Sequence, residues 1–116
     1  MNPIDFYRLA VELYSDTATS QAKLRTAIGR AYYSAFLCAR DRVSLEGVKQ
    51  DVHKQVINKY HSTGNQQDTL LANNLEDLRA LRTDADYRCK TDVTRRNAGK
   101  SLGLSKKILT QLGLIN

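Results

Sequence analysis

The chain has 116 residues, 41% of them hydrophobic and 26% charged, with a formal net charge of +6. A chain of this length buries one modest core, which excludes a multidomain enzyme and a large sandwich or barrel, so we expect a single domain over residues 1–116. No stretch of about 18 apolar residues is present, and the start of the chain carries no secretion signal. We therefore expect a cytoplasmic protein without a membrane partner.

Residue types and punctuation predict an all-α chain. Leu and Ala total 26 residues, Val and Ile total 11, and Pro3 is the only proline. Good helix formers with few β-branched residues favour helices. Five helices are expected, over residues 3–14, 18–43, 48–61, 66–88 and 92–112. Short connections make sequential helices antiparallel, so we predict an up-and-down bundle of four main helices with a short third piece.

Caps and apolar spacing set the expected boundaries. The run Ser15-Asp16-Thr17 ends the first helix and offers caps, and Gly47 is expected to close the turn after the second. Apolar residues three and four apart form one face of each helix. The predicted faces are Phe6, Leu9, Ala10 and Leu13; Leu24, Ile28, Ala31, Ala35 and Cys38; Val52, Val56 and Tyr60; Leu71, Leu75, Leu78, Arg82 and Ala85; and Ala98, Leu102, Leu109 and Leu112.

The positive charge is concentrated near the end of the chain. Residues 88–107 hold seven Lys and Arg against Asp92 alone, whereas residues 1–87 hold 11 basic and 11 acidic residues. A neutral body with one basic segment suits a phosphate-bearing or acidic partner. A solvated helix face rich in Lys and Arg is the alternative.

The sequence predicts no metal site and no cofactor. The two cysteines, Cys38 and Cys89, have no CxxC spacing, and alone they are too few for a tetrahedral site. We expect both to be reduced thiols. The chain also has no cluster of carboxylates and histidines at ligand spacing.

One charged residue interrupts an apolar stripe. Arg82 stands where its helix otherwise places Leu, and a buried charge needs partners, so we expect it at a helix–helix seam or a subunit interface. Asp86 lies four residues on and can hydrogen-bond it, while Arg79 shares the face. On the second helix Arg30 and Tyr33 align likewise. These groups are either salt-bridge clusters that hold the helices together or an anion site in which guanidinium groups hold a phosphate.

These same residues carry a resemblance. The stretch Gly29–Phe36 (GRAYYSAF), then His53, then Arg79–Tyr87 (RALRTDADY) resembles the HEPN superfamily, and the closest likeness is to its short single-domain prokaryotic members. The likeness spans roughly residues 20–90 and keeps the motif order. It implies a four- to five-helix bundle that forms a homodimer along its motif-bearing helices.

The resemblance also implies an activity. Many HEPN proteins are metal-independent endoribonucleases, often toxins of toxin–antitoxin or defence modules, with the motif Arg, four to six residues, then His. Two motifs meet across the dimer, where Arg steadies the scissile phosphate and His moves a proton at the ribose 2′-hydroxyl. A 2′,3′-cyclic phosphate follows. On this basis Arg82 is the expected catalytic cation, and Arg30, Tyr33, Arg79 and Asp86 are the expected substrate-binding residues.

The sequence departs from the motif at one position. Four residues separate Arg82 from Tyr87, which stands where the nuclease motif has histidine. A phenol, with a pKa of about 10, is a poor base at pH 7, but it can donate a hydrogen bond or act as an acid. His53 is an expected catalytic residue if the third helix approaches the cleft, and a structural or capping residue otherwise. His61, near a helix end, is expected to be exposed.

Two further readings stay open beside the nuclease. Some HEPN partners are nucleotidyltransferase antitoxins that modify a tyrosine near the motif, and here Tyr87 is the nearest candidate, with Tyr32 or Tyr33 behind it. In the second hypothesis the chain is a non-catalytic module that binds RNA, a nucleotide or such a nucleotidyltransferase. In the third hypothesis it is a structural interaction protein with an acidic partner.

Overall fold

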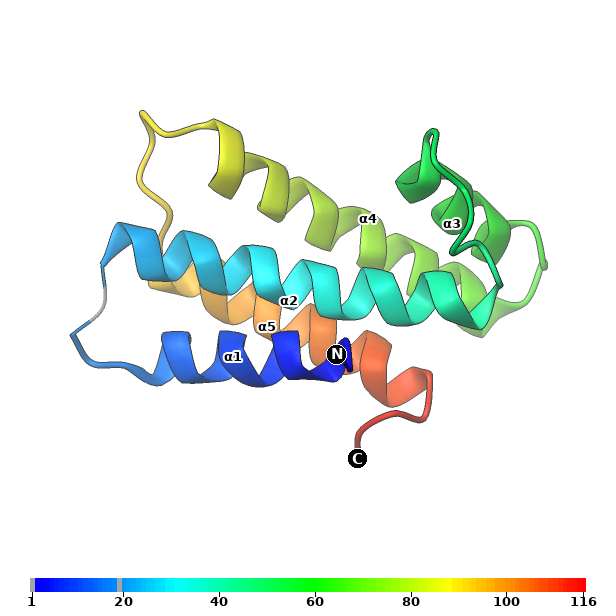
Figure 1. The fold of residues 1–116 in the computed structure, drawn as a ribbon, viewed down its shortest axis with the longest axis horizontal. Coiled ribbons are helices and arrows are strands. Elements are labelled where there is room, and N and C mark those ends of the chain that lie inside the picture. Colours follow the sequence, from blue (N-terminus) through cyan, green and yellow to red (C-terminus); the bar gives the residue numbers. More distant parts are fainter. Residues whose placement is uncertain (1, 19) are drawn as a thin grey trace.

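The computed structural model describes residues 2–18 and 20–116, and five helices make up the fold (Figure 1). They are α1 (Ile4–Ser15), α2 (Gln21–Arg42), α3 (Val52–His61), α4 (Gln66–Tyr87) and α5 (Arg95–Gln111). The described residues contain no strand, so the predicted all-α class is confirmed. Thr19, inside the predicted start of the second helix, lies outside the described residues.

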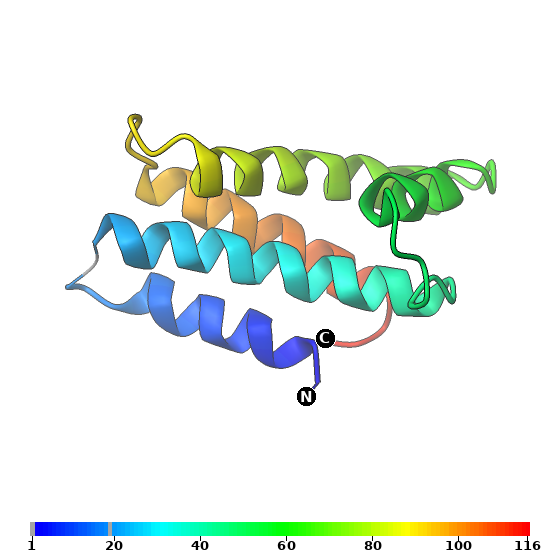
Figure 2. The ribbon, with the colours of Figure 1, turned by 45° about the horizontal axis from the view of Figure 1, so that its top comes forward.

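Helix α2 is the centre of the bundle, because it contacts all four other helices. The long helices alternate in direction, so that α2 and α5 run one way while α1 and α4 run the other (Figure 2). Helix α3 is short and lies across one end, against α4 and the end of α2. The up-and-down arrangement of four main helices with a short third piece is therefore as predicted.

Side-chain caps account for the observed helix starts. Ser20 accepts a hydrogen bond from the backbone N–H of Lys23, Asn65 accepts from Gln67, and Thr94 accepts from Asn97. These caps satisfy N–H groups that have no partner inside the helix. They also explain why α2 and α5 begin three residues later than predicted, since the capping residue must keep a non-helical backbone.

The connection from α2 to α3 differs from the prediction. Helix α2 ends at Arg42, and the residues with left-handed backbone are Ser44, with φ of 59°, and Asp51, with φ of 52°. Gly47, the expected turn residue, does not have a positive φ. Residues 43–51 are not helical, so α3 begins at Val52 rather than at residue 48.

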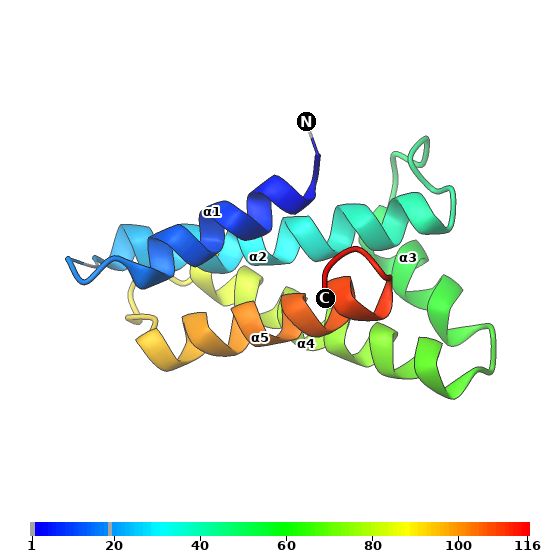
Figure 3. The same cartoon turned by 90° about the horizontal axis from the view of Figure 1, so that it is seen from below.

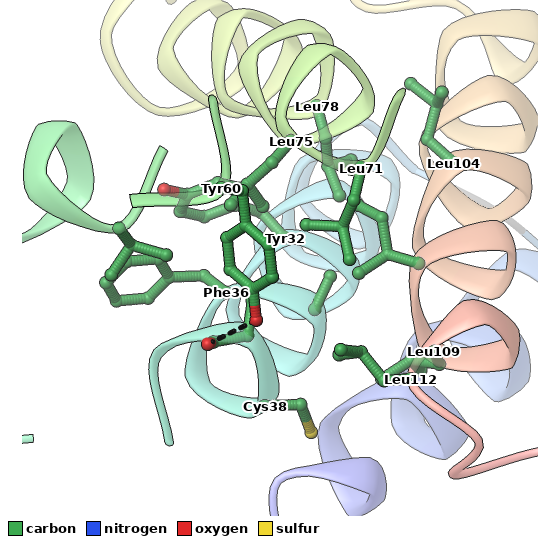
Figure 4. Close-up of a cluster of buried hydrophobic side chains, with 14 of the residues drawn as sticks. Tyr32, Phe36, Cys38, Tyr60, Leu71, Leu75, Leu78, Leu104, Leu109 and Leu112 are labelled. Carbon is green, nitrogen blue, oxygen red and sulfur yellow. Dashed lines mark hydrogen bonds between the residues drawn. The ribbon is translucent and has the colours of Figure 1, made fainter. Parts of the chain in front are cut away.

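One main core fills the space between α2, α4 and α5, with α3 closing one end (Figure 4). Tyr60 of α3 is buried there, and its hydroxyl donates to the backbone carbonyl of Ala39 at 2.8 Å. Helices α2 and α5 approach closely through small residues, and the Ser105 hydroxyl donates to the Ala31 carbonyl at 2.8 Å. The predicted apolar faces are buried or partly buried, except that Leu9 is exposed.

Two leucines on α4 test the assignment of this core. Leu75 is fully buried, whereas Leu70 on the same helix is 52% exposed. Leu75→Ala should lower the free energy of unfolding by about 2–5 kcal/mol, because it removes buried methyl groups and leaves a cavity. Leu70→Ala, the matched control, should change it by less than about 0.5 kcal/mol. Urea denaturation measures both, and equal losses would contradict the assigned packing.

Candidate functional site

Arg82 lies in the seam between α4 and α2, as predicted, with only 15% of its side chain exposed. Its Nη2 donates a hydrogen bond to the Tyr33 hydroxyl at 2.8 Å. The guanidinium carbon lies 5.2 Å from the ring centroid of Tyr33, 5.8 Å from that of Tyr32 and 5.7 Å from that of Tyr87. The faces of aromatic rings attract a cation, so three tyrosines help to hold this charge inside the fold.

Asp86 supplies the negative charge beside Arg82. The Nε of Arg82 lies 2.8 Å from Oδ2 of Asp86, the pairing expected four residues apart on a helix. The buried Nε–H is not aligned with an acceptor, so the contact is an ion pair and not the hydrogen bond we expected. The carboxylate therefore neutralises Arg82 without directing its N–H groups.

Helix α3 brings His53 into the same cluster. The His53 ring stacks on Phe36, with ring centroids 4.1 Å apart, and on Tyr32, with centroids 5.6 Å apart. Nδ1 of His53 is hydrogen-bonded to the hydroxyl of Tyr32. The third helix thus approaches the Arg82 seam, which was the condition for His53 to take part in the site.

The surroundings keep the His53 ring neutral. Burial, together with the positive charges of Arg79 and Arg82, lowers the pKa of His53 to about 4. Burial also raises the pKa of the Tyr32 hydroxyl above its usual range. At neutral pH Tyr32 therefore donates its proton to Nδ1, and the histidine carries its own hydrogen on Nε2.

A hollow of about 240 Å³ lies between α2 and the end of α4, and Arg82 is not among the residues that line it. Two of its walls, Tyr33 and Asp86, are the groups that contact Arg82. Arg30 also lines it, with its guanidinium carbon 5.3 Å from the ring centroid of Phe6 in α1. Three of the four predicted substrate-binding residues therefore meet at one hollow, lined by Arg25, Thr26, Gly29, Arg30, Tyr33 and Asp86.

Arg79, the fourth predicted substrate-binding residue, lies elsewhere on α4. It lines a shallow hollow on the α3 side of the helix, together with Glu76 and Thr83. Its charge still reaches His53, because it is one of the groups that lower the pKa of that ring. Arg79 thus acts on the field at His53 and does not border the hollow beside Arg82.

The tyrosines of the site differ in access. Tyr87 is 70% exposed although its ring lies beside Arg82, whereas Tyr32 is fully buried. Tyr33 is partly buried and lines the hollow. An enzyme that modifies a tyrosine here can reach Tyr87, and the burial of Tyr32 removes it as a candidate.

Sequence reasoning missed two residues that position the end of α4. Arg25 donates to the carbonyls of Ala85 at 2.7 Å and Thr91 at 2.6 Å, which satisfies backbone groups left free at the helix end. Gln21 exchanges two hydrogen bonds with the backbone of Val93, at 2.8 and 3.0 Å. The signal for Arg25 was its spacing, since it shares a helix face with Tyr33 eight residues on.

The basic segment at residues 88–107 divides into structural and free charges. Arg88 pairs with Asp84 at 3.2 Å, and Arg95 donates to the Tyr14 carbonyl at 2.6 Å while lying over the Tyr14 ring. The other cations of α5 are exposed, on a helix whose Ser105 faces α2. The exposed charges of α5 therefore do not converge on Arg82.

His61 is exposed, as predicted, with its Nε2 3.0 Å from Glu76. Within residues 2–18 and 20–116, no three His, Cys, Asp or Glu side chains gather as a metal site would require. No helix in this part of the chain is long and apolar enough to cross a bilayer.

Comparison with known proteins found no matching family model, curated protein or solved structure.

The state of His53 makes the stability of the fold depend on pH. A free histidine has a pKa of about 6.5, so the unfolded chain binds a proton as the pH falls below that value, while folded His53 stays neutral until about pH 4. Stability is fully present above pH 6.5 and is lost as the pH falls toward 4. Urea unfolding should show a loss of about 2 kcal/mol between pH 7 and pH 5.

His53→Gln is the control for this titration, because it keeps a polar side chain and leaves His61 in place. The variant should lose most of the dependence between pH 7 and pH 5. An unchanged dependence would show that another group is responsible.

Proposed function

We propose that this protein is a HEPN-family, metal-independent endoribonuclease that acts as a homodimer, as a toxin or defence effector. One observation carries the proposal: Arg82, which the sequence places on an apolar stripe, lies in the α2–α4 seam beside a hollow lined by Arg30 and Tyr33. The three stretches that resemble the family thus supply neighbouring side chains, His53 among them.

The proposed reaction needs positive charge at the phosphate. The ribose 2′-oxygen attacks phosphorus and the bond to the 5′-oxygen breaks, giving a 2′,3′-cyclic phosphate and a 5′-hydroxyl. Negative charge builds on the phosphoryl oxygens, where Arg82 and Arg30 stabilise it. The 2′-hydroxyl loses its proton to solvent water, and the leaving 5′-oxygen gains one from an acid on the protein, which solvent then reprotonates.

Tyr87 is the group we assign to the leaving oxygen. It is exposed, lies beside Arg82, and as a phenol holds a proton that an alkoxide readily takes. His53 is neutral and its Nδ1 already accepts from Tyr32, so it serves this chemistry as a hydrogen-bond donor through Nε2. A second copy completes the cleft, since one chain supplies only one Arg82 and one Tyr87.

A non-catalytic HEPN module is the second candidate, and a specific observation favours it. Tyr87 replaces the motif histidine, and the imidazole of His53 has its pKa lowered to about 4, which makes it a weak base. Such a module would bind RNA, a nucleotide or a partner nucleotidyltransferase through the same Arg82 hollow. The exposed Tyr87 would then be the residue that a nucleotidyltransferase modifies.

The decisive experiment is cleavage of single-stranded RNA by the purified protein in EDTA, with Arg82→Ala beside it. The variant should lose about 10²–10³-fold in rate, the loss typical of removing a group that stabilises transition-state charge. Arg88→Ala is the matched control, because Arg88 directly follows the same helix and forms an exposed ion pair with Asp84. Its rate should stay within about twofold.

Two results would overturn the nuclease. One is the absence of cleavage by the wild-type protein, and the other is cleavage that Arg82→Ala leaves intact. RNA or nucleotide binding without turnover would favour the module instead. Light scattering on the same samples tests the homodimer, and a monomer would contradict the shared cleft.

Tyr87 gives a second prediction. Tyr87→His restores the family motif and should raise the cleavage rate by at least about tenfold, because an imidazole exchanges protons near neutral pH. Tyr87→Phe keeps the ring against Arg82 but removes the hydroxyl, so it should lower the rate. Rates measured in EDTA from pH 6 to 9 check both, and equal rates for all three proteins would exclude Tyr87 from the reaction.

A further inference from the structure

Helix α5 carries a row of cations that the Arg82 site does not use. Its sequence, RRNAGKSLGLSKKILTQ, holds five Lys and Arg and no acidic residue. Arg96, Lys100 and Lys107 are exposed, and none of the ion pairs formed among residues 2–18 and 20–116 includes them. This row is therefore a surface of free positive charge.

The row faces away from α2. Ser105 faces α2, since its hydroxyl bonds to the Ala31 carbonyl. At 3.6 residues per turn, Arg96, Lys100 and Lys107 lie roughly 140–180° around the helix from Ser105, and the row is about 16 Å long. Helix α5 lies behind α2 in Figure 1, and its far side is turned outward (Figure 3). The row and the Arg30–Tyr33 hollow therefore lie on opposite sides of the bundle.

Helix stability does not account for Arg96. The N-terminus of a helix carries a partial positive charge, so arginines in the first turn are unfavourable there. The carbonyl and ring of Tyr14 compensate Arg95, but Arg96 is exposed beside it. Charge that the fold does not use suggests a ligand outside the molecule.

A groove of about 400 Å³ between α4 and α5 continues this surface. Lys106 and Lys107 border it, and Leu70 on α4 is 52% exposed there. Its other walls are Gln67, Asn74, Thr110 and Gln111, and the surface that the groove exposes is mainly apolar. An apolar groove bordered by cations suits a nucleotide, whose base has apolar faces and whose phosphate is anionic.

We propose that the outer side of α5 binds the backbone of single-stranded RNA, independently of the Arg82 site. Arg96, Lys100 and Lys107 contact phosphates, and the α4–α5 groove receives one nucleotide. Nucleic-acid interfaces are polar and dominated by phosphate contacts, whereas protein interfaces have an apolar or aromatic centre. The exposed cations lie along one side of α5, where they can meet successive phosphates, and the exposed Leu70 lies in the groove where the base is placed, so RNA fits this surface better than an acidic protein does.

The test measures fluorescence anisotropy of a labelled 20-nucleotide 2′-O-methyl oligouridine, which cannot be cleaved through a 2′-hydroxyl. The triple variant Arg96→Gln, Lys100→Gln, Lys107→Gln should bind at least about tenfold more weakly at 50 mM salt. The slope of log K against log salt should fall by about 2, the value for three phosphate contacts on a single strand.

The control triple variant Lys49→Gln, Lys54→Gln, Lys59→Gln removes the same charge from exposed residues near α3. It should bind within about threefold of wild type with little change in slope. Equal losses in the two variants, or no loss in either, would overturn the proposal. So would poly-glutamate binding that competes as strongly as the oligonucleotide. Thermal melting confirms that both variants are folded.

The outcome is separable from that of the nuclease assay. Arg82→Ala should lose cleavage, whereas its salt slope for the oligonucleotide should fall by no more than about 1, since only one cation is removed. The α5 triple variant should still cleave a four-nucleotide RNA, which is too short to span both surfaces. If the wild type binds the oligonucleotide through α5 but cleaves no RNA, the nuclease proposal is wrong and the α5 proposal holds. If it cleaves RNA but the α5 triple variant binds as tightly as wild type, the α5 proposal is wrong and the nuclease proposal holds.

Discussion

The buried guanidinium of Arg82 is the constraint on which the seam between α2 and α4 depends. A charge removed from water costs several kcal/mol unless other groups replace the solvent. Here the replacements come from two helices: the carboxylate of Asp86, the hydroxyl of Tyr33 and the faces of three tyrosine rings. Breaking any of these leaves a partly compensated charge inside the fold, so the position of α4 on α2 and the geometry of the site are set by the same contacts.

The second layer of the site rests on α3. His53 lies between Phe36 and Tyr32, and Tyr32 in turn contacts Arg82, so a short helix at the end of the bundle is coupled to the seam. Arg25 performs a similar task at the other end, where it donates to a carbonyl in the last turn of α4 and to the Thr91 carbonyl in the segment that follows. Residues that border the hollow are thus held by groups on α2, α3 and α4, and all of these contacts involve side chains rather than backbone alone.

Periodicity predicted what is local and missed what depends on how helices cross. The stripe through Leu71, Leu75 and Leu78 predicted the buried face of α4, and it identified Arg82 as the one charged residue on that face. Residues 43–51 have no such period, and two non-glycine residues there adopt left-handed backbone, so the path to α3 was not predictable. The hydrogen bond between Tyr32 and His53 joins residues 21 positions apart in the sequence, and it depends on how residues 43–51 connect α2 to α3.

Charge shows the same limit, because a sequence gives the number of cations but not their directions. The segment 88–107 reads as one basic unit, yet the fold commits Arg88 and Arg95 to intramolecular contacts and turns the remaining charges of α5 away from the Arg82 seam. Helical period alone separates Arg96 and Lys107 from Ser105. Which partner helix Ser105 faces is a tertiary fact, so the separation of two positive surfaces became visible only in the fold.

The field that would attract a phosphate also decides the chemistry left to His53. Burial lowers the pKa of the imidazole most, and the positive charges of Arg79 and Arg82 add to this, so the ring is neutral. An anion bound at Arg82 would offset that repulsion and raise the pKa of His53, because an opposite charge nearby favours the protonated form. Proton affinity at His53 and anion binding at Arg82 are therefore linked, and each strengthens the other. Under the proposed function, this coupling would make His53 a better proton donor once a phosphate is bound beside Arg82.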